Sequence, residues 1–297
     1  MTSPGDTIRW LSDTPRLEAP VMVVALTGWI DSGGAAQSAM QAVMTECDGS
    51  PIAVFDDDPF IDFRARRPTL HLDEGLNTLV EWQHITVSVG RDLAGHDLVL
   101  LSGPEPDMAW HRFRSEVSHL ARLLGVSAMA HLGAYPFAAP HTRSPRLSIT
   151  TPSQDVLARV PFLRSTLEVP AGVCAVLEHE MHALGIPSLG IWAQVPHYVS
   201  TMPYPAAAVA LLDGLREAVD VVVDGTGIRQ QTVKQRQRID DLIAGNDEHR
   251  AMLEQLERIH DSTDDTPSGI DFGGPRIELR SADEIGAEIE QFLRDQD

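Results

Sequence analysis

Short apolar segments alternate along this chain with segments whose apolar residues recur every three or four positions, and this alternation restricts the fold more than any other feature. Val21–Thr27, bounded by Pro20 and Gly28, is rich in Val and is typical of a strand buried on both faces. Ser32–Glu46 follows with the apolar spacing of a helix. The pattern therefore predicts an α/β domain, with a largely parallel sheet covered by helices on both faces. It predicts further strands at Pro51–Asp56, Ile85–Val89, Asp97–Ser102, Val126–Leu132, Arg146–Thr150 and Ser188–Val195, and further helices at Ala109–Leu124, Gly172–Leu184 and Pro205–Ala218.

Two stretches interrupt this regular alternation. Asp57–Asn77 and Gly133–Arg146 show no clear period and are expected to be long, irregular loops. Long loops in a compact α/β domain usually carry function or form an interface. Between the expected strands, Ser153 has the residue type of a helix N-cap.

The composition argues against several classes of protein. The chain has 297 residues, of which 43% are hydrophobic, enough to form a substantial core. With 23 basic against 43 acidic residues, the net charge is -20, so a nucleic acid is not an expected partner. Lys234 is the only lysine, which argues against P-loop and Schiff-base enzymes. Cys47 and Cys174 show no metal-binding spacing, so we expect neither a zinc site nor a disulfide framework, and no cofactor.

The hydropathy pattern gives no sign of a membrane protein. No apolar run approaches the roughly 20 residues that a membrane-spanning helix needs. The first twenty residues lack the basic and apolar regions of a secretion signal. We therefore expect a cytoplasmic protein that does not bind membranes.

Charge divides the chain into a body and a tail. From Ile239 to Asp297 there are 17 acidic and 5 basic residues, a net charge of -12, whereas the rest of the chain carries -8. We therefore expect an α/β body at 1–229 and an acidic helical tail at 230–297, with a flexible linker at 261–275.

Within the tail, Thr232–His260 predicts two short helices in a hairpin, broken at Gly245. Ser281–Leu293 has the pattern of a capped helix. Because the apolar residues are few and the charge is self-repelling, the chain from Thr232 on is expected to be dispensable for folding of the body.

Candidate site residues follow several of the expected strands. Asp31 lies in the glycine-rich segment 28–34, where a strand leads into a helix. Free backbone N–H groups at such a position can bind an anion. The alternative is a tight turn in which Asp31 caps the helix.

Three arginines, Arg64, Arg66 and Arg67, stand close together in this acidic chain. Guanidinium groups bind carboxylate or phosphate in a forked geometry. The alternative, which we favour, is that they pair with local acids such as Asp56, Asp57, Asp58 and Asp62, or with a neighbouring subunit.

Glu105 and Asp107 lie directly between an expected strand and an expected helix. Ligands of open α/β sheets collect at the carboxyl ends of strands, so these two carboxylates are candidates for a general acid/base pair. A stiff turn between two prolines, with Asp107 capping the helix, explains them equally well.

His141, which is followed by Arg143, and His197 each come after a proline beyond a strand. Such histidines are candidate acids or bases, although a hydrogen-bonded structural role is more common. The segment from Glu178 to His182 resembles a zinc motif, but its histidines are three residues apart rather than four. A solvated helix face is the better interpretation, and we expect no metal.

Taken together, these segments resemble the PAC2 family, which is named after a proteasome assembly chaperone subunit. The resemblance rests on five motifs in order, which are Gly28-Trp29-Ile30-Asp31, Asp62-Phe63-Arg64 with Arg67-Pro68, Gly103-Pro104-Glu105-Pro106-Asp107 with Trp110, His141-Thr142-Arg143, and Val195-Pro196-His197-Tyr198. It spans about Val21 to Leu215.

The resemblance implies a three-layer α/β/α sandwich with a mainly parallel mixed sheet, similar to the phosphorylase/hydrolase-like fold. It also implies self-association, as a homotrimer, or pairing with a related subunit. Eukaryotic relatives are assembly chaperones for the proteasome α-ring. Proteasome subunits are therefore the expected protein partners.

Two functions of different classes remain open, with a ligand sensor as a third. The leading expectation is a non-enzymatic scaffolding or chaperone-like protein linked to proteasome assembly or function. The alternative is a small-molecule enzyme of the phosphorylase/hydrolase type, with a pocket at the strand carboxyl ends. In that pocket the following side chains would converge: Asp31, Arg64, Glu105, His141, Arg143 and His197.

One geometric expectation follows from the order of the strands. If the strands that precede them are parallel, then Asp31, Glu105, His141 and Arg143 all leave the same edge of the sheet. We therefore expect these four side chains to form one polar cluster.

Overall fold

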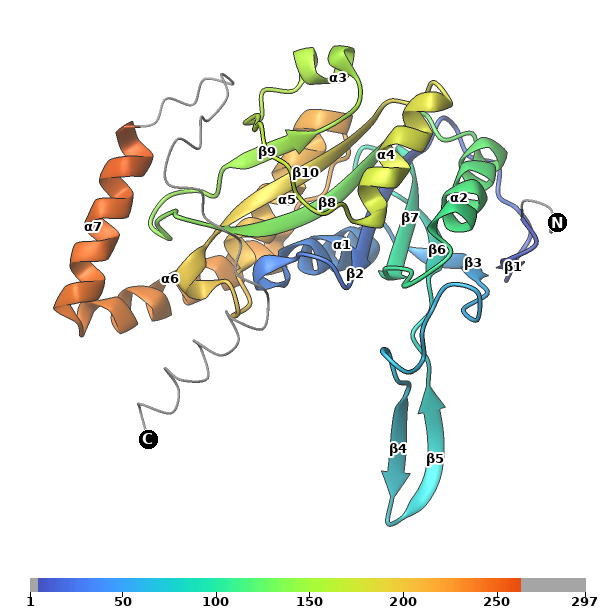
Figure 1. Ribbon diagram of the computed structural model, residues 1–297, viewed down its shortest axis with the longest axis horizontal. Helices are drawn as coiled ribbons and strands as arrows, with labels where there is room; N and C mark the ends of the chain where they lie inside the picture. The colour runs from blue at the N-terminus through green and yellow to red at the C-terminus, as the bar shows by residue number, and fades with distance from the viewer. Residues whose placement is uncertain (1–4, 263–297) are drawn as a thin grey trace.

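An eight-stranded sheet forms the centre of the computed structural model, which describes residues 5–262 (Figure 1). Its strands are β1 (Ile8–Trp10), β2 (Val21–Thr27), β3 (Ser50–Phe55), β6 (Thr86–Arg91), β7 (Asp97–Pro104), β8 (Ala128–Phe137), β9 (Leu147–Thr150) and β10 (Ser188–Pro196). The remaining two strands, β4 (Thr69–Asp73) and β5 (Leu76–Glu81), pair with each other. The helices are α1 (Ala35–Glu46), α2 (Trp110–Leu124), α3 (Gln154–Arg159), α4 (Val173–Ala183), α5 (Pro205–Val219), α6 (Thr226–Ala244) and α7 (Asp247–Ser262), with 3₁₀ turns η1 (Ser32–Gly34) and η2 (His197–Val199).

The sheet is mixed, with a parallel centre. Its strand order is β1-β3-β6-β7-β2-β8-β10-β9. The four neighbours β7, β2, β8 and β10 are parallel to one another, whereas β1, β3, β6 and β9 join through antiparallel pairs. From these pairings, β3 points the same way as the four central strands. The loops after β2, β3, β7, β8 and β10 therefore leave one side of the sheet, called the carboxyl edge below.

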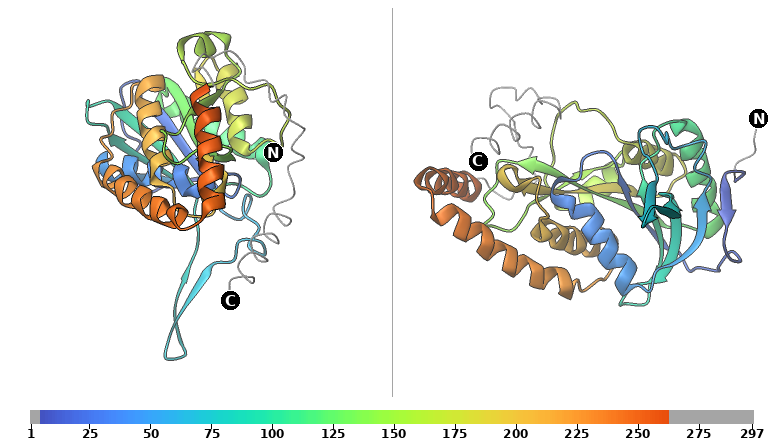
Figure 2. Two further views of the ribbon diagram at one scale, coloured as in Figure 1. Left: turned by 90° about the vertical axis from the view of Figure 1, so that its left-hand side faces the viewer. Right: turned by 90° about the horizontal axis from the view of Figure 1, so that it is seen from below.

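Helices cover both faces of this sheet, as Figure 2 shows. The alternate residues Val23 and Ala25 of β2 lie in a core with α1, α5 and α6. Met22 and Val24 of the same strand point to the other face, into a core with α2 and α4. The apolar run from Val21 to Leu26 fits a strand that is buried on both faces. The protein is thus a three-layer α/β/α sandwich, which confirms the expected fold class.

Most local signals of the sequence correspond to real elements. β2 has the expected bounds. Gly125 ends α2 in the left-handed conformation, with φ 69°. Ser153 caps α3, because its hydroxyl accepts a hydrogen bond from the Val156 N–H at 3.3 Å.

The stretch expected to be an irregular loop from Gly133 on is partly a strand. β8 continues to Phe137 and stays in parallel register with β10, where Gly133 lies beside Trp192. A Cβ atom at Gly133 would lie 2.4 Å from the Trp192 ring, so this position needs a glycine. This glycine therefore makes room for the tryptophan on the neighbouring strand.

The stretch Asp57–Asn77 was also expected to be irregular, and this expectation is wrong. It contains most of the β4–β5 hairpin, which stands out from the body at the carboxyl edge (Figure 1). The turn residues Glu74 and Gly75 have φ 46° and 89°, and two positive φ values are typical of a tight hairpin turn. Every residue of both strands is exposed.

α6 and α7, called the arm below, form the second projecting segment. α6 begins before the expected domain boundary at residue 229 and passes through it. Ile239 and Ile243 of α6 lie in the same core as α1 and α5. α7 does not run back along α6 as a hairpin would, but leaves it at a corner (Figure 1). Ser281–Leu293 and nearly all of the expected linker lie outside the described residues.

The chain that leads into the arm is held by carboxylates of the body. Asp92 accepts a hydrogen bond from the Val222 N–H at 2.8 Å. Glu46 accepts hydrogen bonds from the N–H groups of Asp224 and Gly225, both at 2.8 Å. Among the described residues, no helix is long and apolar enough to cross a membrane.

Candidate functional site

Asp31 follows β2 and serves the helix that comes next. Its carboxylate accepts hydrogen bonds from the N–H groups of Ala36, at 2.8 Å, and Gln37, at 3.1 Å, across the η1 turn. Burial raises the pKa of this carboxyl group, although the hydrogen bonds from the helix N–H groups partly offset that rise. Asp31 also forms a parallel bridge with Ala134 of β8. This arrangement corresponds to the helix-capping alternative.

Glu105 and Asp107 follow β7 and turn to different partners. Oε1 of the buried Glu105 accepts a hydrogen bond from the Val173 N–H at 2.6 Å, at the first residue of α4. Asp107 instead forms an ion pair with Arg66 at 2.9 Å. It does not cap α2, whose N-cap residue is Ala109. Each carboxylate therefore ties a loop of the carboxyl edge to a neighbouring segment.

The arginines next to the hairpin are used differently from one another. Arg66 pairs with the distant Asp107, rather than with the local acids that we favoured as partners. The side chains of Arg64 and Arg67 are exposed, and no described residue forms an ion pair or hydrogen bond with either. Asp62 accepts a hydrogen bond from the backbone N–H of Arg64 at 2.9 Å. Two guanidinium groups thus remain unpaired at the base of the hairpin.

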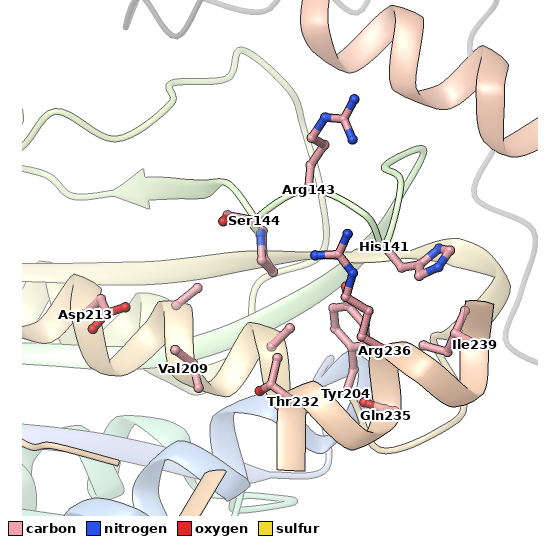
Figure 3. Close-up of a pocket in the computed structure, with 13 residues that line it drawn as sticks. His141, Arg143, Ser144, Tyr204, Val209, Asp213, Thr232, Gln235, Arg236 and Ile239 are labelled. Atoms are coloured by element: carbon pink, nitrogen blue, oxygen red, sulfur yellow. The ribbon is translucent and has the colours of Figure 1, made fainter. Parts of the chain in front are cut away.

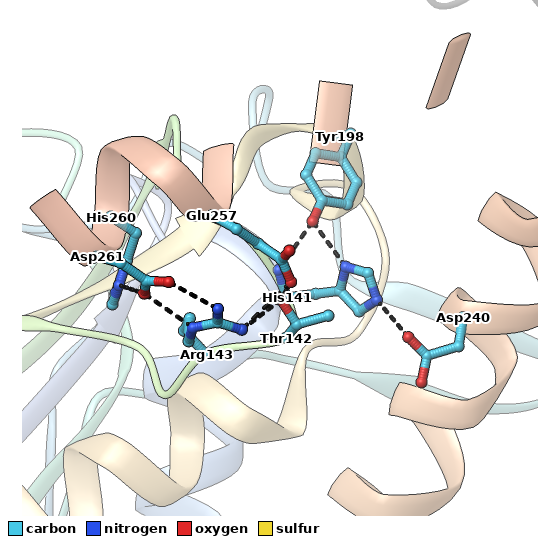
Figure 4. A network of polar contacts seen from close by, with 8 residues as sticks. All are labelled: His141, Thr142, Arg143, Tyr198, Asp240, Glu257, His260 and Asp261. Atoms are coloured by element: carbon cyan, nitrogen blue, oxygen red, sulfur yellow. Dashed lines mark hydrogen bonds and ion pairs between the residues drawn. The ribbon is translucent and has the colours of Figure 1, made fainter. Parts of the chain in front are cut away.

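His141 and Arg143 lie in the loop between β8 and β9 and reach across to the arm (Figure 4). The His141 ring is buried between Tyr198 and α6. Its Nδ1 lies 2.8 Å from the Tyr198 hydroxyl, and its Nε2 lies 2.9 Å from Oδ1 of Asp240. The backbone N–H of His141 also donates to the Tyr198 oxygen at 2.8 Å. Burial raises the pKa of Tyr198 to about 12, so its hydroxyl stays protonated at neutral pH.

Arg143 and Thr142 join the same loop to α7. Two guanidinium nitrogens of Arg143 donate to the carboxylate of Asp261, at 2.9 and 2.8 Å, in a forked pair. Arg143 and the Thr142 hydroxyl also donate to Glu257, at 3.2 and 2.5 Å. The hydrogen bond from Arg143 lowers the pKa of Asp261. These contacts and those of His141 are called the loop–arm network below.

His197 takes no part in this network. It opens η2 after β10, and its exposed ring meets the Tyr198 ring edge to face at 5.3 Å. The backbone carbonyl of His197 accepts a hydrogen bond from the Ser200 hydroxyl at 2.8 Å.

The expected cluster of Asp31, Glu105, His141 and Arg143 is not held together by direct bonds. The strands β2, β7 and β8 are parallel, as the argument required, and their loops share the carboxyl edge. No hydrogen bond or ion pair joins any two of these four described residues, however. Each side chain is engaged by a separate element: α1, α4, α6 or α7.

One buried polar pair was missed by the sequence interpretation. Glu178 was assigned to a solvated helix face, yet it is only 4% exposed. Its Oε1 lies 2.6 Å from Nε2 of the buried His131 and accepts the Thr150 hydroxyl at 2.7 Å. The pair ties α4 to β8 and β9. Among residues 5–262, no group of three or more His, Cys, Asp or Glu side chains could hold a metal ion.

The family model for PAC2 matches residues 25–243 of this chain. This protein belongs to the PAC2 family. Similar solved structures include a PAC2 family protein of Streptomyces avermitilis, which is 33% identical with a TM-score of 0.72. The alignment covers 79% of this chain and 99% of that one. None of the curated proteins matches this chain.

Two further structures from actinobacteria are similar to this PAC2 member. A Mycobacterium tuberculosis protein called a proteasome-assembly chaperone homologue is 30% identical, with a TM-score of 0.73 over 80% of this chain and 99% of that one. A Corynebacterium glutamicum protein of unknown function is 29% identical, with a TM-score of 0.80 over 86% and 97% of the two chains.

The loop–arm network crosses the end of the PAC2 match. The matched region includes Asp240, the partner of His141, but it stops before α7, which carries Glu257 and Asp261. His141 thus joins two parts of the PAC2 region, whereas Arg143 joins that region to the helix that follows it.

Proposed function

We propose that this PAC2 family protein is a non-enzymatic scaffolding protein with a chaperone-like role, which acts by binding other protein chains. The observation that carries the proposal is the exposed apolar hairpin at the carboxyl edge. The polar side chains of the same edge support it, because most of them are engaged in separate structural contacts. An enzyme pocket at the strand ends would need those groups to converge on one space.

The hairpin presents an apolar surface that the described part of the chain leaves uncovered. We define the hairpin surface by its large exposed side chains, Leu70, Leu72, Leu76, Leu79, Val80 and Trp82. Leu72 and Leu76 are 62% and 68% exposed. A two-stranded hairpin alone is marginally stable in water, and its outer edges have unpaired backbone groups. A large exposed apolar patch of this kind is typical of an interaction site.

A second copy of this chain is the occupant that we propose for the hairpin surface. The free arginines Arg64 and Arg67 at its base favour an acidic surface, and the chain has a net charge of -20. Closed symmetric assembly is the usual arrangement for soluble homo-oligomers. A homotrimer, as the family resemblance implied, fits this proposal.

The oligomeric state tests the hairpin surface. Light scattering at micromolar concentration should give a multimer for the wild-type chain and a smaller species for Leu72→Asp with Leu76→Asp. The matched control is Leu242→Asp, because Leu242 is 66% exposed on the arm. A monomeric wild-type chain, or a hairpin variant that assembles as the wild type does, would contradict the proposal.

The client of this scaffold is proposed to be a proteasome subunit, on the strength of the M. tuberculosis relative's description. The test mixes the purified protein with unassembled proteasome α-subunits of its host and follows ring formation by native gel electrophoresis. We expect rings to form faster with the wild-type protein than without it. An unchanged rate, together with no binding of the subunits, would exclude this client.

A further inference from the structure

A small cavity lies beside the loop–arm network, between the loop after β8 and the helices α5 and α6 (Figure 3). Its volume is about 190 Å³. Pockets for drug-sized ligands usually have about 300–1,000 Å³, so this cavity suits a smaller molecule. Its walls combine polar groups with apolar side chains, and the polar groups determine which class of ligand the cavity can bind.

Tyr204 is a largely buried residue whose hydroxyl faces this cavity. The residue is only 3% exposed, yet no described residue forms a hydrogen bond with its hydroxyl. Burial raises the pKa of Tyr204, so the hydroxyl is a neutral donor at physiological pH. The hydroxyl oxygen itself is not fully buried, so a ligand oxygen in the cavity can accept its hydrogen bond.

Arg236 supplies a free positive charge beside this hydroxyl. It extends from α6 across the Tyr204 ring towards the loop that carries His141 and Ser144 (Figure 3). Its charge acts to lower the pKa of Tyr204, as expected for a nearby cation. No described residue forms an ion pair or hydrogen bond with the Arg236 side chain, although the chain as a whole is strongly acidic.

The other charged residues around the cavity are already paired. Asp213 pairs with Arg229, and Asp240 pairs with the His141 ring. The guanidinium group of Arg143 points away from the cavity towards α7. The unpaired charge that faces the cavity is therefore positive, and it comes from Arg236.

Besides the polar residues Ser144, Asp213, Thr232 and Gln235, the cavity has an apolar part that lies mainly along α5. It is formed by Ala206, Val209, Ala210, Pro145 and Ile239. A guanidinium and a phenol with aliphatic side chains beside them match a molecule that has an anionic head and a short hydrocarbon tail.

We propose that this cavity binds a small organic carboxylate, whose oxygens accept hydrogen bonds from Arg236 and the Tyr204 hydroxyl and whose short tail lies against α5. The planar fork of arginine matches a carboxylate, and a single free guanidinium balances a single charge. This site is independent of the hairpin surface and of the proposed scaffolding role.

Calorimetric titration of the full chain with sodium butyrate, at low ionic strength, tests the site. Arg236→Gln should weaken butyrate binding about ten-fold or more, because a charge-assisted pair is lost. Tyr204→Phe keeps the ring and should weaken binding about three- to ten-fold through the lost hydrogen bond. The matched control is Arg238→Gln, since Arg238 is exposed on the same helix and does not line the cavity.

Two further ligands separate charge from apolar contact. Butanol, which lacks the charge, should not bind measurably. Inorganic phosphate, which lacks the tail, should bind more weakly than butyrate. The proposal is overturned if the wild-type chain does not bind butyrate, if phosphate binds more tightly, or if Arg236→Gln and Arg238→Gln weaken butyrate binding equally. Unchanged urea unfolding of the variants excludes a folding defect.

Discussion

The two segments that project from the sheet, the arm and the β4–β5 hairpin, are attached to the body by opposite means (Figure 1). The arm buries Ile239 and Ile243 in the core and is fixed further by the loop–arm network. The hairpin packs near its base, where the rings of Phe63 and Trp82 meet at 4.7 Å, while its leucines stay exposed. Both segments are amphipathic or apolar in sequence, yet only the arm buries its apolar residues within the chain.

This difference separates structural apolar residues from those available for recognition. An amphipathic helix has one apolar face, and α6 packs that face against α5. The hairpin has apolar residues on both faces, because Leu70 and Val80 form one cross-strand pair while Leu79 lies opposite His71. No element of the described chain covers either face. Four variants test this contrast, in order of decreasing expected effect on stability.

Ile239→Ala should have the largest effect, because Ile239 is 3% exposed in the core. Such large-to-small substitutions cost about 2–5 kcal/mol, so the free energy of unfolding in urea should fall by that amount. Leu242→Ala, at an exposed position of the same helix, is the control. Equal stability of the two variants would show that the arm is not part of the core.

Truncation after Arg229 tests whether the chain from Thr232 on is dispensable for folding of the body. The buried Ile239 and Ile243 argue against this expectation.

Asp92→Asn should have the next largest effect, because Asp92 holds the segment that leads into the arm. Burial acts to raise the pKa of Asp92, but hydrogen bonds from Val222 and His96 outweigh it, so the pKa lies below its ordinary value. Hydrogen bonds to a charged group contribute about 1.5–3 kcal/mol, and the variant should lose part of this. The readout is urea unfolding, with the exposed Asp241→Asn as control.

The difference in stability between the wild type and Asp92→Asn should change with pH in a defined direction. The hydrogen bond with Asp92 raises the pKa of His96 above its ordinary value. The contribution of Asp92 is present above the ordinary carboxyl pKa of about 4 and is lost as pH falls through its lowered pKa. The contribution of His96 is present below about 6.5 and is lost as pH rises through its raised pKa. The wild-type advantage over Asp92→Asn should therefore be greatest between about pH 4 and 6.5, and a flat difference would contradict this.

Arg143→Ala should have a smaller effect on stability. A loss of about 3–5 kcal/mol would apply to a fully buried pair, but the Arg143 side chain is 36% exposed. Ion pairs at such exposure are screened by water and contribute little, so we expect a smaller loss of stability than for Asp92→Asn. Hydrogen exchange in α7 should become faster, while that in α5 stays unchanged. Arg258→Ala, at an exposed position on α7, is the control, and the same increase there would contradict the role of Arg143.

Leu72→Ala should have the smallest effect on the monomer. Leu72 is 62% exposed, and substitutions at such positions usually change stability by less than about 0.5 kcal/mol. Urea unfolding at nanomolar concentration, where self-association is weak, measures this effect. A loss comparable to that of Ile239→Ala would mean that the hairpin belongs to the core after all.

The hairpin also shows where the sequence interpretation failed. β4 alternates leucine with polar residues, and Glu74-Gly75 after it is a turn signal, so part of the pattern was present in the sequence. It was missed because an isolated hairpin has no continuous apolar run and no helix next to it. The end of β8 was missed for a different reason, since Gly133 meets a ring on another strand.

The candidate residues were found by their motifs, but their partners were not. Arg66 pairs with Asp107 across 41 residues, and His141 pairs with Asp240 across 99. Arg143 pairs with Asp261 across 118 residues, in a segment that the charge pattern had assigned to a separate tail. The spacing of residues within a motif does not predict which distant carboxylate will pair with them.

By itself, the sequence determined the local elements and their layering: the apolar run of β2, the helical period of α1 and α2, and the N-cap of α3 each follow from neighbouring residues. These signals are local because the strand and helix periods repeat within one element. Only the tertiary structure decided that α6 belongs to the core, that the arm takes up His141 and Arg143, and that the hairpin remains uncovered. The contacts of the arm join residues about 100 positions apart, and no local pattern of the sequence specifies such pairs.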